Sequence, residues 1–474
     1  MARIFLALIA VMVQYGFGSG CASAQAEPAL IVSPEDWLVQ EDVTIRVVGA
    51  VPGGQVVIEA QFTDASGQVW SSRGVYHANE HGEVDTASGV SIAGTYQGIE
   101  PRGLIWSVLP SEPSDLPLTA SSWVFEADMP RAPSRPANDA FAVRYVARIQ
   151  TNSRSDDRTT SAVEQTLRIS SPNLVRREIN ERGVRGVLYT PKGDGPFPTV
   201  VVLSGSEGGT PENAARRYAS FGYAAFAVPY FNAEGLADEL SMIPLEHFAD
   251  ALGVARSFYG QERVALDGAS RGAEAALLVA ATYPELVSAV VAYSPSNVVW
   301  SGCCSEEALG KPAFTLDGQG ISAAERYQSP RAVDSIVTST DSPPSMRALF
   351  LAGMLEAQAE IPVEKIDAPI LLISGDADLL WPSSIAAARI HQRLKANNFE
   401  YEVINRTYAG AGHSPASGYP FWALLSSGSS AAHPLDGLPI PLDGDPSSNA
   451  HASIDGFREV IAFLNRHVGT QVSP

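Results

Sequence analysis

The chain has 474 residues, which is enough for two or three domains. Its apolar content of 45%, with 40 glycines and 33 prolines, is typical of a globular protein with many turns and excludes a disordered or fibrous chain. The formal net charge of −20 at pH 7 repels phosphate backbones, so we expect no nucleic-acid partner.

The first 24 residues have the pattern of a secretory signal peptide. Arg3 precedes an apolar stretch at residues 4–13, and Ala22-Ser23-Ala24 has the A-x-A form of a cleavage site. The apolar stretch is too short to span a membrane. We therefore expect an exported protein, periplasmic or secreted, with no integral membrane span; a buried N-terminal helix is the alternative. Cys21 is a second alternative, as the site of a lipid anchor, but Gly18 stands where a lipobox usually has a branched aliphatic residue.

Residues 27 to about 170 predict a small β-sandwich domain. They are rich in β-branched and aromatic residues, lack helical periodicity and contain frequent turn residues. The clearest predicted strands are residues 44–49, 55–63 and 140–148. Strand-like sequence resumes after the turn-rich residues 131–138, so we expect a loop there and place the linker to the next domain at residues 170–179.

Residues 180 to 470 predict an α/β domain, because near-continuous apolar strands alternate with helical patterns. The predicted strands are residues 198–204, 223–231, 264–267, 287–293, 369–374 and 401–405. The predicted helices are residues 214–222, 244–259, 273–283, 384–396 and 454–467. This alternation predicts a mostly parallel sheet covered by helices on both faces. Residues 297–365 interrupt it, and we expect an insertion over the carboxyl ends of the strands, where ligands bind in such sheets.

The sequence Gly268-Ala269-Ser270-Arg271-Gly272 has the G-x-S-x-G form of a nucleophile elbow. It follows a buried strand and opens a helix, as that strand–turn–helix motif requires. The two glycines permit a tight turn, and the serine oxygen then lies near the positive end of the helix. We predict that Ser270 is a nucleophile; a tight turn with a serine at a helix start is the structural alternative.

Chain order then predicts an acid and a histidine after the serine. The predicted strand 369–374 is followed by Asp376 and Asp378, and Asp378 is our choice because it lies farther into the loop. Asp376 is the runner-up, and the alternative role for either is to cap the next helix. Among the histidines that follow, His413 lies in a glycine-rich loop after the last predicted strand, which gives the imidazole room to reach Ser270.

These residue types in this order predict acyl transfer through serine. His413 would remove the proton from Ser270 during attack on an acyl carbonyl and then donate a proton to the leaving group, while Asp378 orients the imidazole. The chemistry requires no metal and no cofactor.

The same mechanism needs backbone N–H groups that stabilise the oxyanion, each worth about 3 kcal/mol. We expect one from Arg271, directly after the nucleophile, and the other from Ser206 or Glu207 in the loop after the predicted strand 198–204. That loop is glycine-rich, but it lacks the lysine of a phosphate-binding P-loop.

Cysteine is scarce. Cys21, Cys303 and Cys304 provide neither a disulfide framework nor spaced metal ligands. We expect the adjacent pair to be two thiols in a loop, because vicinal geometry is poor for a disulfide; a strained vicinal bond is the alternative.

Segments from both predicted domains resemble one known family. They are residues 73–85, 94–107, 229–232, 245–248, 268–274, 375–383, 410–413, 439–446 and 450–457. The chain resembles the acyl-CoA thioesterase and bile acid-CoA:amino acid N-acyltransferase family over residues 28 to 468. The resemblance implies an Ig-like β-sandwich followed by an α/β-hydrolase domain, with a triad at Ser270, Asp378 and His413.

The resemblance also bears on the reaction. Family members that transfer acyl groups to amino acids carry cysteine at the nucleophile position, whereas this chain has Ser270, which favours water as the acceptor. The first hypothesis is therefore a serine hydrolase that cleaves acyl-CoA thioesters, with the insertion shaping its acyl pocket. Two features depart from the family pattern: Asp376-Ala377-Asp378 replaces an acidic run, and the chain carries a leader although acyl-CoA is intracellular.

Two other hypotheses stand beside the first. One is an exported carboxylesterase or amidase that acts on a non-CoA ester or amide. The other is a catalytically inactive envelope binding protein, against which the intact serine, aspartate and histidine argue.

Overall fold

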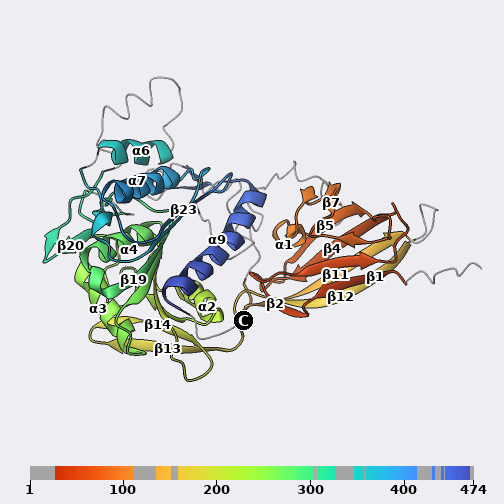
Figure 1. Ribbon diagram of the computed structural model, residues 1–474, viewed down its shortest axis with the longest axis horizontal. Helices are drawn as coiled ribbons and strands as arrows, with labels where there is room; N and C mark the ends of the chain where they lie inside the picture. The colour runs from red at the N-terminus through yellow and green to blue at the C-terminus, as the bar shows by residue number, and fades with distance from the viewer. Residues whose placement is uncertain are drawn as a thin grey trace, which may run out of the picture.

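The structure is a computed structural model, and it describes residues 27–111, 135–150, 158–303, 305, 307–308, 310–325, 346–356, 358–413, 430–432, 439–441 and 444–469. Figure 1 shows two parts, a β-rich N-terminal part and an α/β C-terminal part, with helix α9 (Pro446–His467) between them. No helix in these ranges is long and apolar enough to cross a membrane.

Two β-sheets share one hydrophobic core in the N-terminal part. The larger has the strand order β10-β5-β4-β11-β12-β2, with β8 paired to β5, and the smaller has the order β1-β3-β6. The strands are β1 (Ala29–Ser33), β2 (Asp36–Leu38), β3 (Thr44–Val48), β4 (Gln55–Thr63), β5 (Val69–His77), β6 (Val84–Asp85), β8 (Ala93–Gly94), β10 (Leu109–Pro110), β11 (Ala140–Gln150) and β12 (Arg158–Arg168). Buried residues alternate along β11, as in an antiparallel strand with one face on the core. The predicted strands 44–49, 55–63 and 140–148 correspond to β3, β4 and β11.

The C-terminal part is built on an eight-stranded sheet with the order β13-β14-β16-β15-β18-β19-β22-β23. The strands are β13 (Leu174–Glu181), β14 (Val184–Pro191), β15 (Thr199–Leu203), β16 (Ala224–Val228), β18 (Val264–Ala269), β19 (Val287–Tyr293), β22 (Ile370–Gly375) and β23 (Val403–Tyr408). The strands from β16 to β23 along this order pair in parallel, and β13 and β14 form an antiparallel hairpin at one edge. The prediction of a mostly parallel sheet is confirmed.

Helices cover both faces of this sheet. One face carries α3 (Leu245–Ser257), α4 (Arg271–Thr282) and α7 (Ser383–Ala396), whose apolar residues share a core with the strands. The other face carries α2 (Glu212–Ser220) and the C-terminal half of α9. The central strands are buried from both sides, which explains why β15, β16 and β22 read as continuous apolar runs.

The linker is shorter than expected. Strand β13 begins at Leu174, inside residues 170–179, and pairs with β14 at the edge of the sheet. Most of its side chains are exposed, including Arg176 and Arg177. The strand lies at the edge of the sheet, where it has a partner strand on only one side and its side chains meet solvent. Such a strand carries no apolar run, which is why the sequence pattern pointed to a linker.

The chain between β19 and β22 forms the expected insertion. It contributes β20 (Phe314–Leu316), β21 (Gln319–Gly320) and α6 (Met346–Glu356), which lie outside the eight-stranded sheet (Figure 1). An apolar cluster joins it to the chain after β22 and consists of Val298, Trp300, Ala324, Met354, Trp381 and Ala386. The insertion therefore packs at the carboxyl end of the sheet.

Cys303 is disulfide-bonded, so the expectation of a free thiol is wrong for this residue. Whether such a bond forms depends on loop geometry, which sequence spacing does not give. Cys304 lies outside the described residues.

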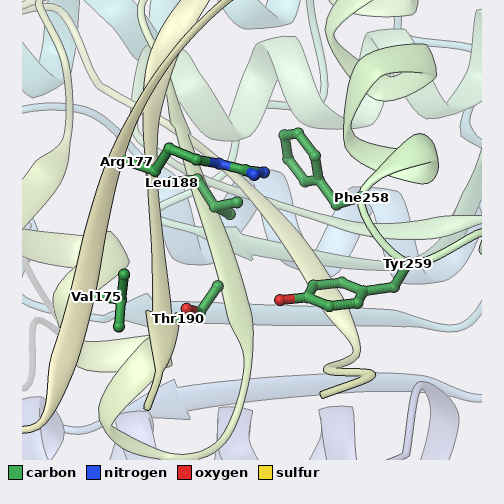
Figure 2. A pocket seen from close by; sticks show the side chains of 6 residues that line it. All are labelled: Val175, Arg177, Leu188, Thr190, Phe258 and Tyr259. Carbon is green, nitrogen blue, oxygen red and sulfur yellow. The ribbon is translucent and has the colours of Figure 1, made fainter. Parts of the chain in front are cut away.

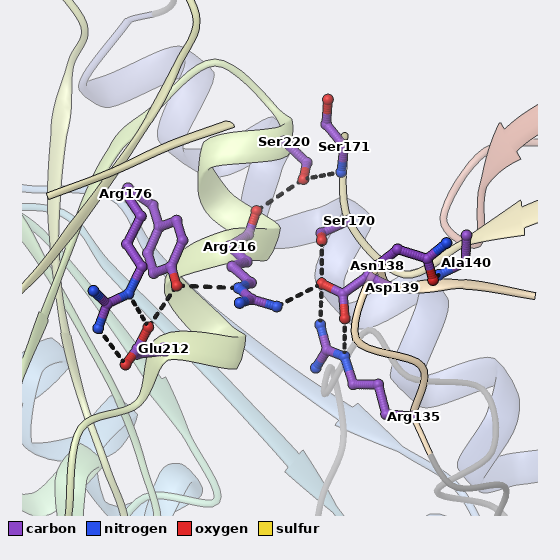
Figure 3. A network of polar contacts seen from close by, with 11 residues as sticks. Arg135, Asn138, Asp139, Ala140, Ser170, Ser171, Arg176, Glu212, Arg216 and Ser220 are labelled. Atoms are coloured by element: carbon purple, nitrogen blue, oxygen red, sulfur yellow. Dashed lines mark hydrogen bonds and ion pairs between the residues drawn. The ribbon is translucent and has the colours of Figure 1, made fainter. Parts of the chain in front are cut away.

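A polar network joins the two parts near the linker (Figure 3). Asp139, directly before β11, accepts hydrogen bonds from Arg135, from Ser170 Oγ at 2.5 Å and from Arg216 Nη1 of α2 at 2.9 Å. Arg216 Nε also donates to Tyr189 Oη of β14 at 3.2 Å. Burial alone would raise the pKa of Asp139, but the hydrogen bonds from arginine and serine outweigh burial and lower it. The network is therefore charged at neutral pH, and it holds β14 and α2 against the β-rich part.

Candidate active site

Ser270 occupies a sharp turn between β18 and α4. Its backbone has φ 56° and ψ −118°, a conformation that costs a non-glycine residue about 1–3 kcal/mol. The turn is held on both sides, because Ser270 N donates to Tyr293 O at 2.8 Å and Ser270 O accepts from Ala273 N at 3.0 Å. The strained serine lies where a strand ends and a helix begins, as a nucleophile elbow requires.

The two glycines of the motif are needed for close packing. A Cβ at Gly268 would lie 2.1 Å from Gly272 O, and a Cβ at Gly272 would lie 2.3 Å from Ser204 O. These contacts are with backbone atoms, which cannot move aside cheaply. The elbow is thus packed directly against the loop that follows β15.

His413 reaches Ser270 from the loop after β23. Its Nε2 lies 3.0 Å from Ser270 Oγ, and its Nδ1 lies 2.9 Å from Asp378 Oδ2. A neutral imidazole with its proton on Nδ1 satisfies both contacts, because it donates to the carboxylate and accepts from the hydroxyl. The side chain is 7% exposed.

Asp378 is completely buried and its carboxylate is well supplied with donors. Oδ1 accepts from the backbone N–H groups of Leu380 at 3.0 Å and Trp381 at 3.2 Å. Oδ2 accepts from Ser383 Oγ at 2.5 Å in addition to the imidazole. These hydrogen bonds compensate the burial of the charge and fix the direction in which the carboxylate faces His413.

Asp376 has a different partner. Its Oδ1 accepts from the backbone N–H of Gly410 at 2.7 Å, and its backbone N–H donates to Tyr408 O at 3.1 Å. The structure thus brings Asp378 to the imidazole and assigns Asp376 to the base of the loop that carries His413.

Ser294 and Trp381 also hold His413 in place. Ser294 Oγ donates to His413 O at 2.6 Å, and Trp381 Nε1 donates to Ser294 O at 3.1 Å. The rings of Trp381 and His413 meet edge to face, with centroids 5.7 Å apart. No local pattern distinguishes Ser294 from other residues at strand ends, whereas Trp381 lies within residues 375–383, one of the segments on which the family resemblance rests.

An aromatic row extends from His413 into the insertion. Phe350 of α6 lies between Trp381 and Trp300, with ring centroids 5.7 Å and 4.9 Å away. Phe350 is half-buried, whereas both tryptophans are buried. The row provides an apolar wall that begins at the imidazole.

The loop after β15, in which the sequence predicted the second oxyanion donor, lies beside the elbow. A Cβ at Gly205 would be 3.3 Å from Ala269 O, the residue before the nucleophile. Within the loop, Gly205 N donates to Glu207 Oε1 at 3.0 Å, and Asn232 Nδ2 donates to Glu207 O at 2.9 Å. Ser206 lies between these two fixed points.

Arg271 turns its side chain away from the serine and toward the insertion. Its Nη2 donates to Trp300 O at 3.2 Å and Ser301 O at 3.1 Å, and its Nε lies 3.3 Å from Glu274 Oε2. Glu274 Oε1 accepts from Trp300 N at 3.0 Å. Burial raises the pKa of Glu274 to about 7. This buried pair attaches the insertion to the first turn of α4.

A second buried carboxyl group lies beneath the elbow. Asp267, on β18, accepts from Tyr218 Oη at 2.9 Å, and Tyr218 Oη lies 2.7 Å from Tyr293 Oη. Burial raises the pKa of Asp267 to about 7, an effect that the hydrogen bond from Tyr218 and the charge of Arg217 only partly offset. Asp267 does not reach the imidazole and is a structural group of the strand.

A cavity of about 190 Å³ lies between the β13–β14 hairpin and the end of α3, lined by Val175, Arg177, Leu188, Thr190, Phe258 and Tyr259 (Figure 2). Its only charged group, Arg177, lies 5.4 Å from the centre of the Phe258 ring, and none of the residues that hold Ser270 lines it. In the described ranges, no group of three or more histidine, cysteine or acidic side chains is placed to hold a metal ion.

Solved structures with detectable similarity include esterases and lipases. They include a hormone-sensitive lipase from a metagenome library, at 12% identity and a TM-score of 0.37 over 63% of this chain and 88% of that chain. A bacterial esterase of the hormone-sensitive lipase family has 13% identity and a TM-score of 0.38 over 63% of this chain and 86% of that chain. Scores this low add nothing to the topology described above.

Curated relatives match over nearly the full chain. Acyl-coenzyme A thioesterase 1 of Rattus norvegicus is 27% identical over 90% of this chain and 94% of its own length. Acyl-coenzyme A amino acid N-acyltransferase 2 of Mus musculus is 28% identical over 93% of this chain and 97% of its own length. The relatives therefore include both hydrolases and transferases.

Family models match both parts of the chain. The acyl-CoA thioester hydrolase/BAAT N-terminal region matches residues 40–133. The BAAT/acyl-CoA thioester hydrolase C-terminal model matches residues 243–470, a range that holds Ser270, Asp378 and His413. The chain belongs to the acyl-CoA thioester hydrolase and bile acid-CoA:amino acid N-acyltransferase (BAAT) family.

Proposed function

We propose that the protein is a serine hydrolase of the acyl-CoA thioesterase type, with Ser270, His413 and Asp378 as its catalytic triad. The observation that carries this proposal is the continuous hydrogen-bonded chain from Ser270 Oγ through His413 to Asp378, with contacts of 3.0 Å and 2.9 Å. Membership of the thioester hydrolase and acyltransferase family supports an acyl thioester as the substrate.

The first half-reaction forms an acyl-enzyme. Ser270 Oγ attacks the thioester carbonyl while His413 Nε2 takes the hydroxyl proton, and Asp378 stabilises the resulting imidazolium. Collapse of the tetrahedral intermediate breaks the carbon–sulfur bond, and His413 returns the proton to the thiol that leaves. The product on the enzyme is an ester of Ser270.

The second half-reaction transfers the acyl group to water. His413 takes a proton from a water molecule, which attacks the ester carbonyl. Collapse of this intermediate releases the carboxylic acid, and His413 returns the proton to Ser270 Oγ as it leaves. An oxygen ester at this position supports water as the acceptor, so we propose hydrolysis and not transfer to an amino acid.

The oxyanion of both intermediates needs fixed N–H donors. We propose the backbone N–H of Arg271 as one donor, since it opens α4 directly after the serine. The packing of Gly205 against Ala269 supports the loop after β15 as the source of the other, from Ser206 or Glu207. We propose that the acyl group lies along the aromatic row of Trp300, Phe350 and Trp381.

The proposal also covers the N-terminal region of the chain. We propose that residues 1–24 direct export to the periplasm or the exterior, with a lipid anchor at Cys21 as the alternative, and that residues 27–170 form an Ig-like sandwich. Export would separate the enzyme from acyl-CoA in the cytoplasm, which favours the second candidate function, a carboxylesterase or amidase acting on a non-CoA substrate. N-terminal sequencing of secreted protein should begin near Gln25, and an intact Met1 would contradict export.

Fluorophosphonate labelling tests whether the serine is active. The wild-type protein should be labelled and Ser270→Ala should not, while Ser220→Ala, which removes a hydroxyl on α2 far from the imidazole, should label as the wild type does. A folded wild-type protein that takes up no label would instead support an inactive binding protein.

Turnover measurements then separate the two enzyme hypotheses. Hydrolysis of palmitoyl-CoA is compared with hydrolysis of p-nitrophenyl esters of several chain lengths, each by kcat/KM. A higher kcat/KM for the thioester supports the thioesterase, and a strong preference for simple esters would favour the carboxylesterase.

A further inference from the structure

Helix α9 belongs to both parts of the molecule. Near its N-terminus, Ala450 and Ile454 are part of the hydrophobic core of the β-rich part. Farther along, Phe457, Val460 and Phe463 pack against the eight-stranded sheet. Figure 1 shows the helix in this intermediate place, with its first turns closest to the β-rich part. A displacement of the β-rich part would therefore be transmitted to the first turns of α9.

Glu100, from the β-rich part, holds two side chains of those turns. Its Oε1 accepts from Ser447 Oγ at 2.7 Å, and its Oε2 lies 2.9 Å from His451 Nε2. The Glu100 side chain is 13% exposed. The hydrogen bond to Glu100 raises the pKa of His451, and the hydrogen bonds from His451 and Ser447 lower the pKa of Glu100 although burial opposes them. Each pKa shift favours the charged form of its group, so the shifts favour an ion pair in which Glu100 is mostly buried and His451 is 43% exposed.

Asn449 lies on α9 between Ser447 and His451, and it faces the loop that carries the catalytic imidazole of His413. Its Oδ1 accepts from the backbone N–H of Gly412 at 2.8 Å, and the residue is buried. A Cβ at Gly444 would lie 2.4 Å from both Asn449 Oδ1 and Gly412 N, so the chain is closely packed around this hydrogen bond. Gly412 is bonded covalently to His413.

The loop needs such support because its own sequence does not fix it. Residues 409–412 are alanine and glycine in alternation, and Gly410 has φ +72°. Glycine loses the most conformational freedom on folding, so the position of the imidazole depends on the hydrogen bonds that hold its neighbours. The side-chain bonds among them run from Gly410 N–H to Asp376, from Gly412 N–H to Asn449 and from Ser294 Oγ to His413 O.

We propose that Asn449 is a positioning residue for His413 and that Glu100 of the β-rich part acts through it, so that the N-terminal part contributes to catalysis without contacting the substrate. The inference rests on the proposed function of Ser270 and His413. According to this inference, the β-rich part affects the rate of the chemical step. Its role is not confined to substrate affinity or to the stability of the fold.

The test compares three single variants and one double variant in the full chain. Asn449→Ala removes the acceptor for Gly412 and should lower kcat about 10- to 100-fold, since a misplaced catalytic group costs that much. Glu100→Ala should lower kcat about 3- to 30-fold, with KM nearly unchanged. Glu100→Gln keeps one acceptor oxygen and should recover part of that loss. The double variant Glu100→Ala/Asn449→Ala should be little worse than Asn449→Ala, because both changes act on one contact.

Asp42→Asn is the matched control at the same interface. Asp42 accepts from Arg458 Nη2 of α9 at 2.6 Å, beyond the turns that carry Asn449, and its side chain is 89% exposed. This variant should leave kcat and the rate of fluorophosphonate labelling as in the wild type. Equal losses in Asp42→Asn and Glu100→Ala would overturn the inference, because they would indicate a general loosening of the interface.

Labelling separates failure of this inference from failure of the proposed function. If the wild type is not labelled, or if Ser270→Ala is labelled equally, the proposed function fails first. If the wild type is labelled and Glu100→Ala has an unchanged labelling rate and kcat, only the inference fails. If Glu100→Ala does not fold, Asn449→Ala and Glu100→Gln decide, and unchanged rates in Asn449→Ala would overturn the proposal.

Discussion

The replacement Asp378→Asn tests the proposed triad most directly, because the structure specifies what the new amide would meet. Oδ1 of Asp378 accepts two backbone N–H groups, so the amide oxygen of asparagine should take that place. The amide NH₂ would then face His413 Nδ1, from which the carboxylate Oδ2 accepts a hydrogen bond at 2.9 Å in the native protein. Two donors cannot face each other, so His413 should carry its proton on Nε2 instead.

A proton on Nε2 blocks the proposed reaction. Nε2 lies 3.0 Å from Ser270 Oγ and must accept the hydroxyl proton, which it cannot do when it already carries one. A tautomer error of this kind costs about 10⁴ in kcat, or about 5–6 kcal/mol of transition-state stabilisation. The NH₂ group would also oppose the Ser383 hydroxyl, but that group can rotate and accept.

The assay is kcat for the better substrate of the panel, with Asp376→Asn as the matched control. Asp376→Asn keeps an amide oxygen for Gly410 N–H and should lose less than about tenfold in kcat. Circular dichroism and the melting temperature verify that both variants are folded. A loss of about 10⁴ in Asp376→Asn, with activity retained in Asp378→Asn, would refute the assignment of the acid.

Three further predictions concern packing, pH and substrate length. Gly272→Ala places a Cβ 2.3 Å from Ser204 O, so it should destabilise the protein by about 1–3 kcal/mol and slow fluorophosphonate labelling; an unchanged melting temperature and labelling rate would contradict the packing argument. Asp267 has a pKa of about 7 in the folded protein and about 4 in the unfolded chain. Its contribution to the free energy of unfolding is therefore complete below pH 4 and is lost as the pH rises from 4 to 7, by up to about 1.4 kcal/mol per pH unit. Asp267→Asn cannot ionise and should flatten the dependence of unfolding free energy on pH between 5 and 7 in urea titrations; an unaltered slope would show that Asp267 is ionised in the folded protein. Phe350→Ala opens the aromatic row and should change kcat/KM for long acyl chains by about tenfold or more relative to short ones, whereas an equal change for all lengths would argue against an acyl site there.

The sequence alone determined the features that depend on residues close together in the chain. Buried strands appear as apolar runs because both faces of the sheet are covered, and the elbow appears because its glycines and serine stand within five positions. Chain order then selected Asp378 and His413 as candidates. The sequence did not predict the edge strand β13, because its exposed, charged side chains form no apolar pattern.

Only the tertiary structure decided which distant groups meet. Ser270 and His413 are 143 positions apart, and the hydrogen bond between Glu100 and Ser447 joins residues 347 positions apart. Asp376 and Asp378 have the same chemistry and nearly the same place in the sequence, yet the turn after β22 directs one to Gly410 and the other to the imidazole. Contacts of this kind depend on how whole elements pack, and packing is a property of three-dimensional distances that local sequence patterns do not contain.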